Sequence, residues 1–496
     1  MRAALEAADL PLRREPHHTV AALGGGPDHD REPAAGHRPA DRLTGWTELQ
    51  RGRGDKPLPG TPVSPDDRTG GAPEQQRSFR EGLFQLKEKA ISFSNGDALL
   101  KDARRMAGTV AGRGGGYVAT SVAGEKVRAY VPAPLPPVPP LDVGQFLSLY
   151  DRARGAIGRL DGVTTILPST PLFLFMYVRK EALLSSQIEG TQSSLSDLLL
   201  FENDEIPLVP TDDVTEVSNY VAAIDHGIER IRGGFPLSLR LLREMHEILL
   251  RSGRGASKQP GEFRRSQNWI GGTRPGNALF VPPPPDRLMD CLGAFERFLH
   301  TDDPAMPPLI RAGLAHVQFE TIHPFLDGNG RVGRLLITLM LCEAGALREP
   351  ILYLSLFLKS RRDDYYRLLQ EVRQAGGWEA WMEFFLTGVA ETGEQAADTA
   401  RELMALFDAD RLAIRDFGRS ATSVLRVHEL LQRRPIVTIQ AASKQLGLSL
   451  PTVGKALELM GAAGIVREMT GKRRHRVFAY SRYLSLLDQG TEPLPA

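Results

Sequence analysis

The residues with the clearest chemical potential form the segment HPFLDGNGRVGR, residues 323–334. Gly328, Asn329 and Gly330 can take backbone conformations closed to most residues, so successive N–H groups can face an anion where a helix begins. Arg331 and Arg334 are three residues apart, so on a helix they share a face and can bind phosphate bidentately. This spacing predicts a phosphate-binding loop.

Other side chains of the same segment predict chemistry on a nucleotide. Asp327 offers hard oxygen ligands beside the phosphates, which suits Mg²⁺. His323 titrates near neutrality and is a candidate base toward an attacking hydroxyl. Pro324 fixes the entry to the loop, and Phe325 is expected to point into the core. A capped helix start with incidental charges is the alternative, but the combination of these features favours the phosphate site.

The elements that must position this loop are predicted to be helices. Apolar residues recur at three- and four-residue spacing through most of residues 146–406, which predicts a mainly α body. Residues 268–285 are predicted to form a short hairpin with a proline-rich exit, and residues 130–140 an extended proline strap. Helices are predicted over residues 146–160, 172–184, 194–201, 214–232, 237–251, 285–300, 307–322, 331–344, 361–375 and 378–406.

Composition excludes several classes of protein. The 496 residues are 42% apolar and 24% charged, which is an ordinary globular composition with room for two or three domains. A net charge of +1 leaves no global field toward nucleic acid or membrane. Two cysteines exclude a disulfide scaffold and a cysteine zinc site. The apolar stretches are too short to span a bilayer, so we expect no membrane association and a cytoplasmic location.

The two ends of the chain differ from this body. A quarter of residues 1–80 are Gly or Pro, so residues 1–105 are expected to be disordered or a non-native extension before Met106. Residues 421–482 carry eleven Lys or Arg against three Asp or Glu. Their pattern predicts helices over 423–432, 438–446 and 451–463, then strands over 465–469 and 476–480 around a basic turn. This is the layout of a winged helix-turn-helix, with residues 451–463 as recognition helix and residues 472–476 as wing.

The segment HPFLDGNGRVGR resembles the full signature of Fic-domain proteins, HPFxDGNGRxxR, at every fixed position. FRRSQNWIGG and FVPPPP, within residues 263–285, resemble the target-binding flap of that family, and residues 353–369 and 378–389 are similar to its downstream helices. The resemblance implies a helical bundle with a short β-hairpin flap. It divides the chain into an N-terminal region with an inhibitory helix (106–215), a catalytic core (216–390), a helical linker (391–420) and the winged helix-turn-helix (421–488).

The resemblance also implies an activity, the transfer of AMP from ATP to a Ser, Thr or Tyr hydroxyl of a target protein. His323 would deprotonate that hydroxyl, Asp327 would hold Mg²⁺ on the α- and β-phosphates, and Arg334 would pair with the γ-phosphate. The remaining implied binding residues are the anion hole at Gly328, Asn329 and Gly330, with Phe325 and Arg331 beside it, and the target-pairing flap residues Trp269, Ile270 and Gly271.

Gly330 bears on the kind of transfer. Relatives that phosphorylate their targets carry Lys at this position, so Gly330 argues against that activity. Relatives that transfer phosphocholine also exist, and the motif by itself does not exclude them.

A second motif, SSQIEG, matches the inhibitory pattern of the family. Its residues are Ser185, Glu189 and Gly190. A carboxylate at a helix end can pair with Arg334 and occupy the place of the γ-phosphate, so the resemblance implies autoinhibition. In some relatives the same glutamate supports removal of AMP. The alternative is a helix that ends at glycine.

Three further residues are weaker candidates. Gln318 lies one turn before the loop and could face the nucleotide or pack internally. Arg361 occupies a family position where a smaller polar residue is expected near the base, which puts that contact in doubt. His316 is expected to be a buried structural histidine rather than a second base.

Two functions from different classes follow. The first is an adenylyltransferase with residues 421–488 as an accessory part, which we call the C-terminal unit. The second is a DNA-binding regulator that uses the Fic core as a nucleotide sensor. The intact His323 and Asp327 favour the first, because a sensor needs no base. The target protein, a homodimer, and the choice between DNA and protein as partner of the C-terminal unit are left open.

Overall fold

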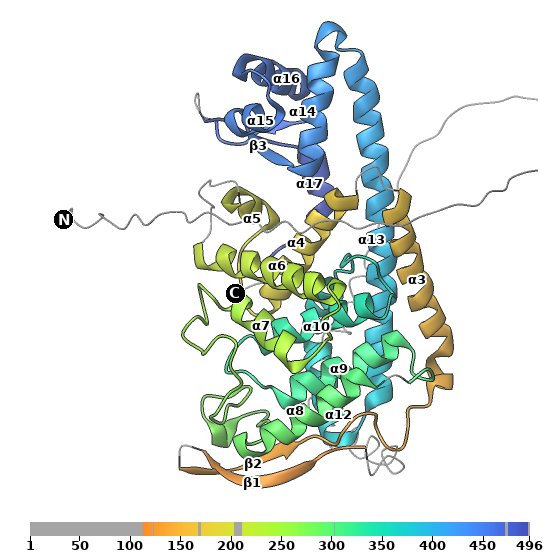
Figure 1. The fold of residues 1–496 in the computed structure, drawn as a ribbon, viewed down its shortest axis with the longest axis vertical. Coiled ribbons are helices and arrows are strands. Elements are labelled where there is room, and N and C mark those ends of the chain that lie inside the picture. The colour runs from red at the N-terminus through yellow and green to blue at the C-terminus, as the bar shows by residue number, and fades with distance from the viewer. Residues whose placement is uncertain are drawn as a thin grey trace, which may run out of the picture. The chain divides into compact units, whose positions relative to one another are not determined.

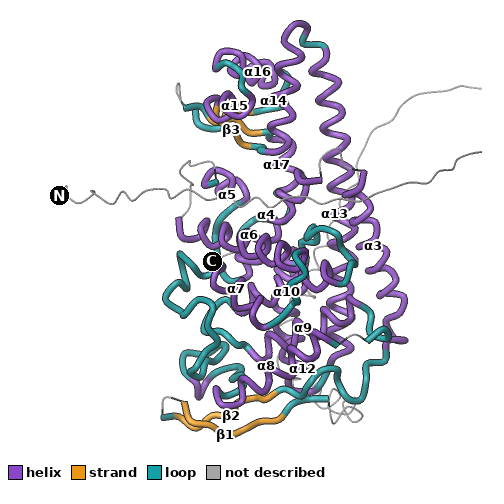
Figure 2. Tube along the Cα trace, in the orientation of Figure 1, coloured by secondary structure: helices purple, strands orange, loops and turns teal. Residues whose placement is uncertain are grey.

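Helices form most of the described chain, which confirms the mainly α prediction (Figures 1 and 2). The structure is a computed structural model that describes residues 113–122, 124–166, 170–202, 211–301, 303–471 and 475–494. The predictions made for residues 1–105 lie outside these ranges. In chain order the elements are β1 (Gly116–Val122), β2 (Glu125–Val131), α3 (Leu147–Ile166), α4 (Thr170–Ile188), α5 (Leu195–Phe201), α6 (Thr211–Arg232), α7 (Leu239–Leu249), α8 (Pro285–His300), α9 (Pro308–Ile322), α10 (Asn329–Glu343), α11 (Ser355–Ser360), α12 (Arg362–Ala375), α13 (Trp378–Arg415), α14 (Ala421–Arg433), β3 (Ile436–Thr438), α15 (Ile439–Leu446), α16 (Leu450–Ala462), β4 (Arg467–Glu468), β5 (Val477–Ala479) and α17 (Ser481–Leu487).

Local sequence signals explain where several helices begin. Proline occupies the first turn of α8, α9 and α16, where its missing N–H is not needed. Ser194 and Asp197 form a capping box at the start of α5, and Ser238 caps α7. The bounds predicted for these helices therefore lie within two residues of the observed ones.

The hairpin of β1 and β2 was not predicted, and it is the main correction to the sequence-based fold. The two strands pair antiparallel, from Gly116 opposite Val131 to Val122 opposite Glu125. Their apolar side packs on the second arm of the segment 268–285, because Val127 and Val281 belong to one small cluster. The burial that stabilises this hairpin comes from a segment about 150 residues further along the chain, which local periodicity does not register.

The hairpin predicted over residues 268–285 is reduced to a single bridge between Ile270 and Phe280. Gly271 and Gly272 turn the chain with positive φ, and the prolines from 282 to 285 donate no backbone hydrogen bond. The segment is therefore a loop with one paired rung. We call residues 263–284 the flap.

The core is built around α9 and α10. Helix α9 is buried along nearly its whole length and packs against α8, α10, α12 and α13. Helix α13 runs along α3 and continues without a break past the boundary predicted at residue 390. Gly393 lies 3.2 Å from the Ala156 side chain, measured from the position of an added Cβ, which is the close approach that a small residue permits. The site loop joins two of the most deeply buried helices of the chain.

The described C-terminal residues form four helices, α14 to α17, and a small antiparallel sheet in strand order β3-β5-β4. The helices agree with the predicted ones, while β3 and α17 were not predicted. Of the predicted wing, residues 472–474 lie outside the described ranges. Among the described residues, no helix has the length and apolar character needed to cross a membrane.

Candidate active site

The candidate active site is the loop that joins α9 to α10. His323 is the C-cap of α9 and takes the left-handed conformation, with φ 49°. Its N–H donates to the carbonyl of Phe319 at 2.9 Å. A residue other than glycine pays about 1–2 kcal/mol for this conformation, and such strain persists only where the surroundings hold it.

Arg264, in the flap, stabilises this conformation of His323. It is 2% exposed, and its guanidinium donates to the carbonyls of His323 at 2.9 Å, Ile322 at 3.4 Å and Pro283 at 2.6 Å. Its own N–H donates to the carbonyl of Pro324 at 2.9 Å. One buried side chain therefore binds the last carbonyls of α9 and connects both arms of the flap to the loop that holds His323.

A second buried arginine acts on the same helix end. Arg373, on α12, donates to the carbonyl of Glu320 at 3.1 Å and to the hydroxyl of Thr321 at 3.2 Å. Burial lowers the pKa of His323 to about 3, and the charges of Arg373 and Arg264 act in the same direction. The imidazole is therefore neutral at physiological pH and able to accept a proton. Its Nδ1 has no hydrogen-bond partner among the described residues.

The loop itself is held from inside by Asn329. The amide side chain of Asn329 accepts from the N–H of Phe325 at 2.8 Å and donates to the Phe325 carbonyl at 2.9 Å. The buried Phe325 ring stacks on His246 at a centroid distance of 3.7 Å. His246 accepts from the N–H of Gly261 at Nδ1, so its Nε2 donates to the carbonyl of Asp327. The side chains of Phe325 and Asn329 thus shape the loop.

The start of α10 has the features of an anion site. Gly328 is the N-cap of this helix with φ 75°, a conformation that favours glycine. Arg331 is 3% exposed, and its nearest carboxylate oxygen belongs to Glu216, at 3.5 Å. Two guanidinium nitrogens of Arg331, Nε and Nη1, have no hydrogen-bond partner among the described residues. A buried cation with unmatched donors at a helix N-terminus is suited to a phosphate group.

Asp327 fits the Mg²⁺ predicted beside those phosphates. Its side chain is 39% exposed, and Oδ1 accepts from the N–H of Gly328 at 2.6 Å, which leaves Oδ2 for a ligand. The described residues contain no group of three or more His, Cys, Asp or Glu that could hold a metal ion. A single carboxylate suits Mg²⁺ that is bound mainly through substrate phosphates and water, and does not suit an all-protein cage.

Arg334 is occupied by the predicted inhibitory helix, α4. Its guanidinium is 2% exposed and donates to Ser185 Oγ at 2.8 Å, to the Ser185 carbonyl at 3.0 Å and to Glu189 Oε1 at 2.7 Å. Burial raises the pKa of Glu189, but Arg334 outweighs it and holds this pKa below the ordinary value. An added Cβ at Gly330 would lie 2.3 Å from Glu189 Oε1, so a residue with a side chain there would displace the carboxylate. Gly190 ends the turn with φ 99°.

Comparison with known proteins agrees with this geometry. Residues 147–229 match the family described as Fic/DOC family N-terminal, and residues 236–341 match the Fic/DOC family. The chain contains a Fic domain. The match spans α7 to α10 and therefore includes His323, Arg334 and the flap.

Relatives of this Fic domain extend over part of the chain. Protein adenylyltransferase Fic of Drosophila ananassae is 36% identical over 135 residues, which are 27% of this chain and 24% of that protein. The protein of the same name from Drosophila melanogaster is 34% identical over the same length. The chain thus spans about a quarter of the length of the curated relatives it matches. Among solved structures, a Fic family protein from Desulfovibrio desulfuricans has a TM-score of 0.45 and 21% identity, and covers 68% of this chain and 95% of that one.

The flap and the two weaker candidates occupy different surroundings. Ile270 exchanges backbone hydrogen bonds with Phe280, and Trp269 is 37% exposed beside it. Gln318 donates to the carbonyl of Ala133 at 2.9 Å, so it secures the segment after β2. Arg361 caps the start of α12 and pairs with Glu391 at 3.2 Å.

Four residues that shape this Fic domain were missed by sequence reasoning. They are Arg264, Arg373, His246 and Glu216, and each acts through contacts across more than 50 residues of chain or through burial. His316 is buried as expected, between the carbonyl of Gly333 and the hydroxyl of Tyr365. The one available sequence signal for Arg264 was its place in the segment FRRSQNWIGG, which resembles the family flap.

Replacing Arg264 should change the titration of His323. In Arg264→Gln a cation that opposes protonation is lost, so the pKa of His323 should rise from about 3 toward its ordinary value. Arg264→Lys keeps the charge and should hold the pKa low, although it loses the fork of hydrogen bonds and lowers the thermal midpoint. Arg265→Gln, at the exposed neighbouring position, is the matched control. Histidine ¹⁵N chemical shifts measured against pH report the result, and an unchanged His323 titration in Arg264→Gln would contradict the assignment.

Proposed function

We propose that this protein is an adenylyltransferase that moves AMP from ATP to a Ser, Thr or Tyr hydroxyl of a target protein. One observation carries the proposal: a neutral His323 stands directly before a helix N-terminus that presents two buried arginines, Arg331 and Arg334. A base and an anion site in one loop are what transfer of a phosphorus-centred group to a hydroxyl requires. The names of the Drosophila relatives support the same activity.

The residues divide the reaction between them. His323 accepts the proton of the target hydroxyl, whose oxygen forms a bond to the α-phosphorus of ATP. The bond between that phosphorus and the bridging oxygen to the β-phosphate breaks, and pyrophosphate leaves with the electron pair. The N–H groups at Gly328 to Gly330 face the negative oxygens of the transferring phosphate, and Arg334 binds the γ-phosphate when Glu189 is absent from it.

Asp327 is the residue that would hold Mg²⁺ in this reaction. Its exposed carboxylate lies at the edge of the anion site, beside the N–H groups that start α10. The metal ion supplies charge neutralisation on the phosphate oxygens when it is bound. Asp327 is itself oriented by the N–H of Gly328, so its position is set before the nucleotide arrives.

The flap is proposed to hold the target. The backbone of Trp269, Ile270 and Gly271 would pair with an extended segment of the target by strand addition. Arg264 supports this role, because it connects the flap to the carbonyl of His323 and so fixes the distance between target backbone and base.

The protein is proposed to be held inactive by Glu189. The Glu189 carboxylate accepts a hydrogen bond from the Arg334 guanidinium that would otherwise bind the γ-phosphate. The carboxylate and the γ-phosphate are both negative, so they repel each other strongly in a partly desolvated site. ATP then binds with its α-phosphate out of line with the hydroxyl, and misalignment of this kind costs about 100-fold in rate. The same carboxylate could orient water for removal of AMP from a modified target.

Loss of the base should abolish transfer and spare binding. His323→Ala, made in the Glu189→Gly background, should reduce transfer by ~10²-fold or more, because the general base is removed while the anion site is intact. ATP affinity, measured by calorimetry, should change little. His226→Ala, a histidine far from the loop on α6, is the control. Unimpaired transfer by His323→Ala would overturn the assignment of the base.

Release of Arg334 should activate the protein. Glu189→Gly should raise automodification from labelled ATP by ~100-fold over the unaltered protein, since the γ-phosphate regains its partner. Arg334→Ala in the same background should cancel the gain. Glu189→Gln, which keeps the shape and removes the charge, should give an intermediate rate. Equal rates for the unaltered protein and Glu189→Gly at all ATP concentrations would show that SSQIEG is only a helix end.

The arrangement of the C-terminal unit supports a second candidate function, DNA binding through α16. Three helices, α14 to α16, accompany a three-stranded antiparallel sheet whose first strand, β3, lies between α14 and α15, and Lys455 is exposed on α16. The full-length protein should then bind duplex DNA with an affinity that falls at least ~10-fold between ~50 and ~200 mM salt. Lys455→Glu should weaken that binding. A retardation assay with no salt-sensitive complex would favour a protein-docking role.

A further inference from the structure

The last turn of the inhibitory helix is held on two opposite sides. Ser185 and Glu189 are four residues apart and face Arg334, whereas Gln187, two residues from each, faces the other way. Gln187 is fully buried, and its Nε2 donates to the carbonyl of Thr491 at 2.7 Å. The residue between the two inhibitory side chains thus binds the C-terminal end of the protein.

The segment that reaches Gln187 is residues 489–492, which we call the tail. Lys359, on α11, donates to Gln187 Oε1 at 2.7 Å, to the Gly490 carbonyl at 3.2 Å and to the Glu492 carbonyl. Lys180, on α4, donates to the carbonyl of Gln489 at 3.0 Å. Four successive tail carbonyls are therefore bound by side chains of α4 and α11.

The two lysines explain why the tail matters to α4. Lys180 and Lys359 are 0% and 6% exposed, and burial lowers the pKa of both, that of Lys180 to about 8. A buried ammonium group is strongly unfavourable unless its donors are matched. The tail carbonyls provide that match, so removal of the tail would take one acceptor from Lys180 and two from Lys359. The end of α4 would lose the contacts that hold it on this side.

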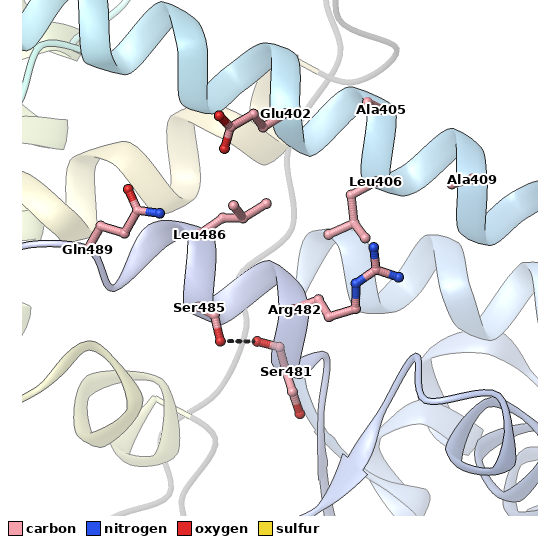
Figure 3. A pocket seen from close by; sticks show the side chains of 9 residues that line it. All are labelled: Glu402, Ala405, Leu406, Ala409, Ser481, Arg482, Ser485, Leu486 and Gln489. Atoms are coloured by element: carbon pink, nitrogen blue, oxygen red, sulfur yellow. Dashed lines mark hydrogen bonds between the residues drawn. The ribbon is translucent and has the colours of Figure 1, made fainter. Parts of the chain in front are cut away.

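The tail is a direct extension of the C-terminal unit. Tyr480 donates to Asp410 Oδ2 at 2.5 Å, and Arg482 pairs with Asp410 Oδ1 at 3.3 Å, which fixes the start of α17 on α13. A groove of about 620 Å³ runs between α17 and α13, from Arg482 of this anchor to Gln489 (Figure 3). Helix α17 is thus tied to α13 at one end and leads into the tail at the other.

We propose that the tail is a latch that keeps Glu189 on Arg334, and that the C-terminal unit controls the active site through it. The partner of the latch is a site of this same chain, made by Lys180, Gln187 and Lys359. Displacement of α17, by whatever binds the C-terminal unit, withdraws the tail carbonyls and frees the last turn of α4. The proposal rests on the proposed function only for its activity readout.

Gly490 offers a way to open the latch with one substitution. Its φ is 76°, and an added Cβ would lie 2.6 Å from Leu356 Cδ1, so Gly490→Val strains the tail backbone and crowds it against α11. Gly464 is the matched control, because it has φ 71° in the same unit and no atom within 4 Å of an added Cβ. Both variants carry a similar backbone strain, and only the first adds a close contact at the tail. A chain that ends at Asp488 removes the tail without strain.

The activity measurement compares automodification from labelled ATP. Automodification by Gly490→Val and by the shortened chain should each exceed that of the unaltered protein about 10-fold or more. This is the expected effect when the inhibited state loses one to two net hydrogen bonds. Gly464→Val should stay at the unaltered rate. In the Glu189→Gly background neither tail change should add activity, because the carboxylate that the latch holds is gone. An additive increase in that background would contradict the latch.

Hydrogen exchange of the amides of residues 187–191 tests the latch without any activity. Exchange there should speed up in Gly490→Val and in the shortened chain, and should stay unchanged in Gly464→Val. Unchanged exchange in folded tail variants, with thermal midpoints to confirm folding, would overturn the proposal. If Glu189→Gly is inactive while exchange responds as expected, the proposed function fails and the latch stands. If Glu189→Gly is active while the tail variants keep the automodification rate and the hydrogen-exchange rates of the unaltered protein, the latch fails and the function stands.

Discussion

The candidate site depends on the hydrogen-bond acceptors of one buried guanidinium, that of Arg334. It is nearly inaccessible to solvent, so it needs acceptors on every side that lacks water. Two of them come from Ser185 on α4 and one from Glu189, directly after its end. A phosphate would supply the same acceptors. In the proposed mechanism the carboxylate and the nucleotide compete for this one set of donors, and release requires only that a side chain and its helix turn withdraw.

The same principle explains the position of the base. His323 is held in a left-handed conformation at the end of α9, where helix carbonyls would otherwise lack donors. Arg264 and Arg373 provide those donors and bring two positive charges near the imidazole. These contacts hold the backbone at the imidazole, and the two charges add to burial, which is the main cause of its lowered pKa. Because Arg264 also binds the flap at Pro283, the surface proposed to receive the target is coupled to the base.

The C-terminal residues extend this logic to the far side of α4. Buried lysines on α4 and α11 are matched by backbone carbonyls of residues 489–492, so the inhibitory turn lies between a guanidinium and a segment of the C-terminal unit. Helix α13 connects the two regions without a break, since it packs on α3 in its first half and on α14 and α17 in its second. A long helix of this kind transmits position better than a flexible linker.

The amino-acid sequence by itself determined the helical body and the catalytic loop. The helical periodicity of 285–300 and 307–322, with proline at each start, located α8 and α9 to within one residue. The loop could be predicted because its chemistry is contiguous: His323, Asp327, the glycines and both arginines lie within twelve residues. Glu189 was found through its own short motif, and its contact with Arg334 agrees with that prediction.

Only the tertiary structure decided what surrounds these residues. The hairpin of β1 and β2 is stabilised by burial against Val281, and the flap, predicted as a hairpin, keeps one rung because prolines and glycines interrupt its pairing. Arg264, Glu216 and the tail at Gln187 act across 50 to 300 residues of chain. Such contacts leave no periodic signal in the sequence. A buried charge is paired with a group that is distant along the chain, and the two groups meet only when the helices pack.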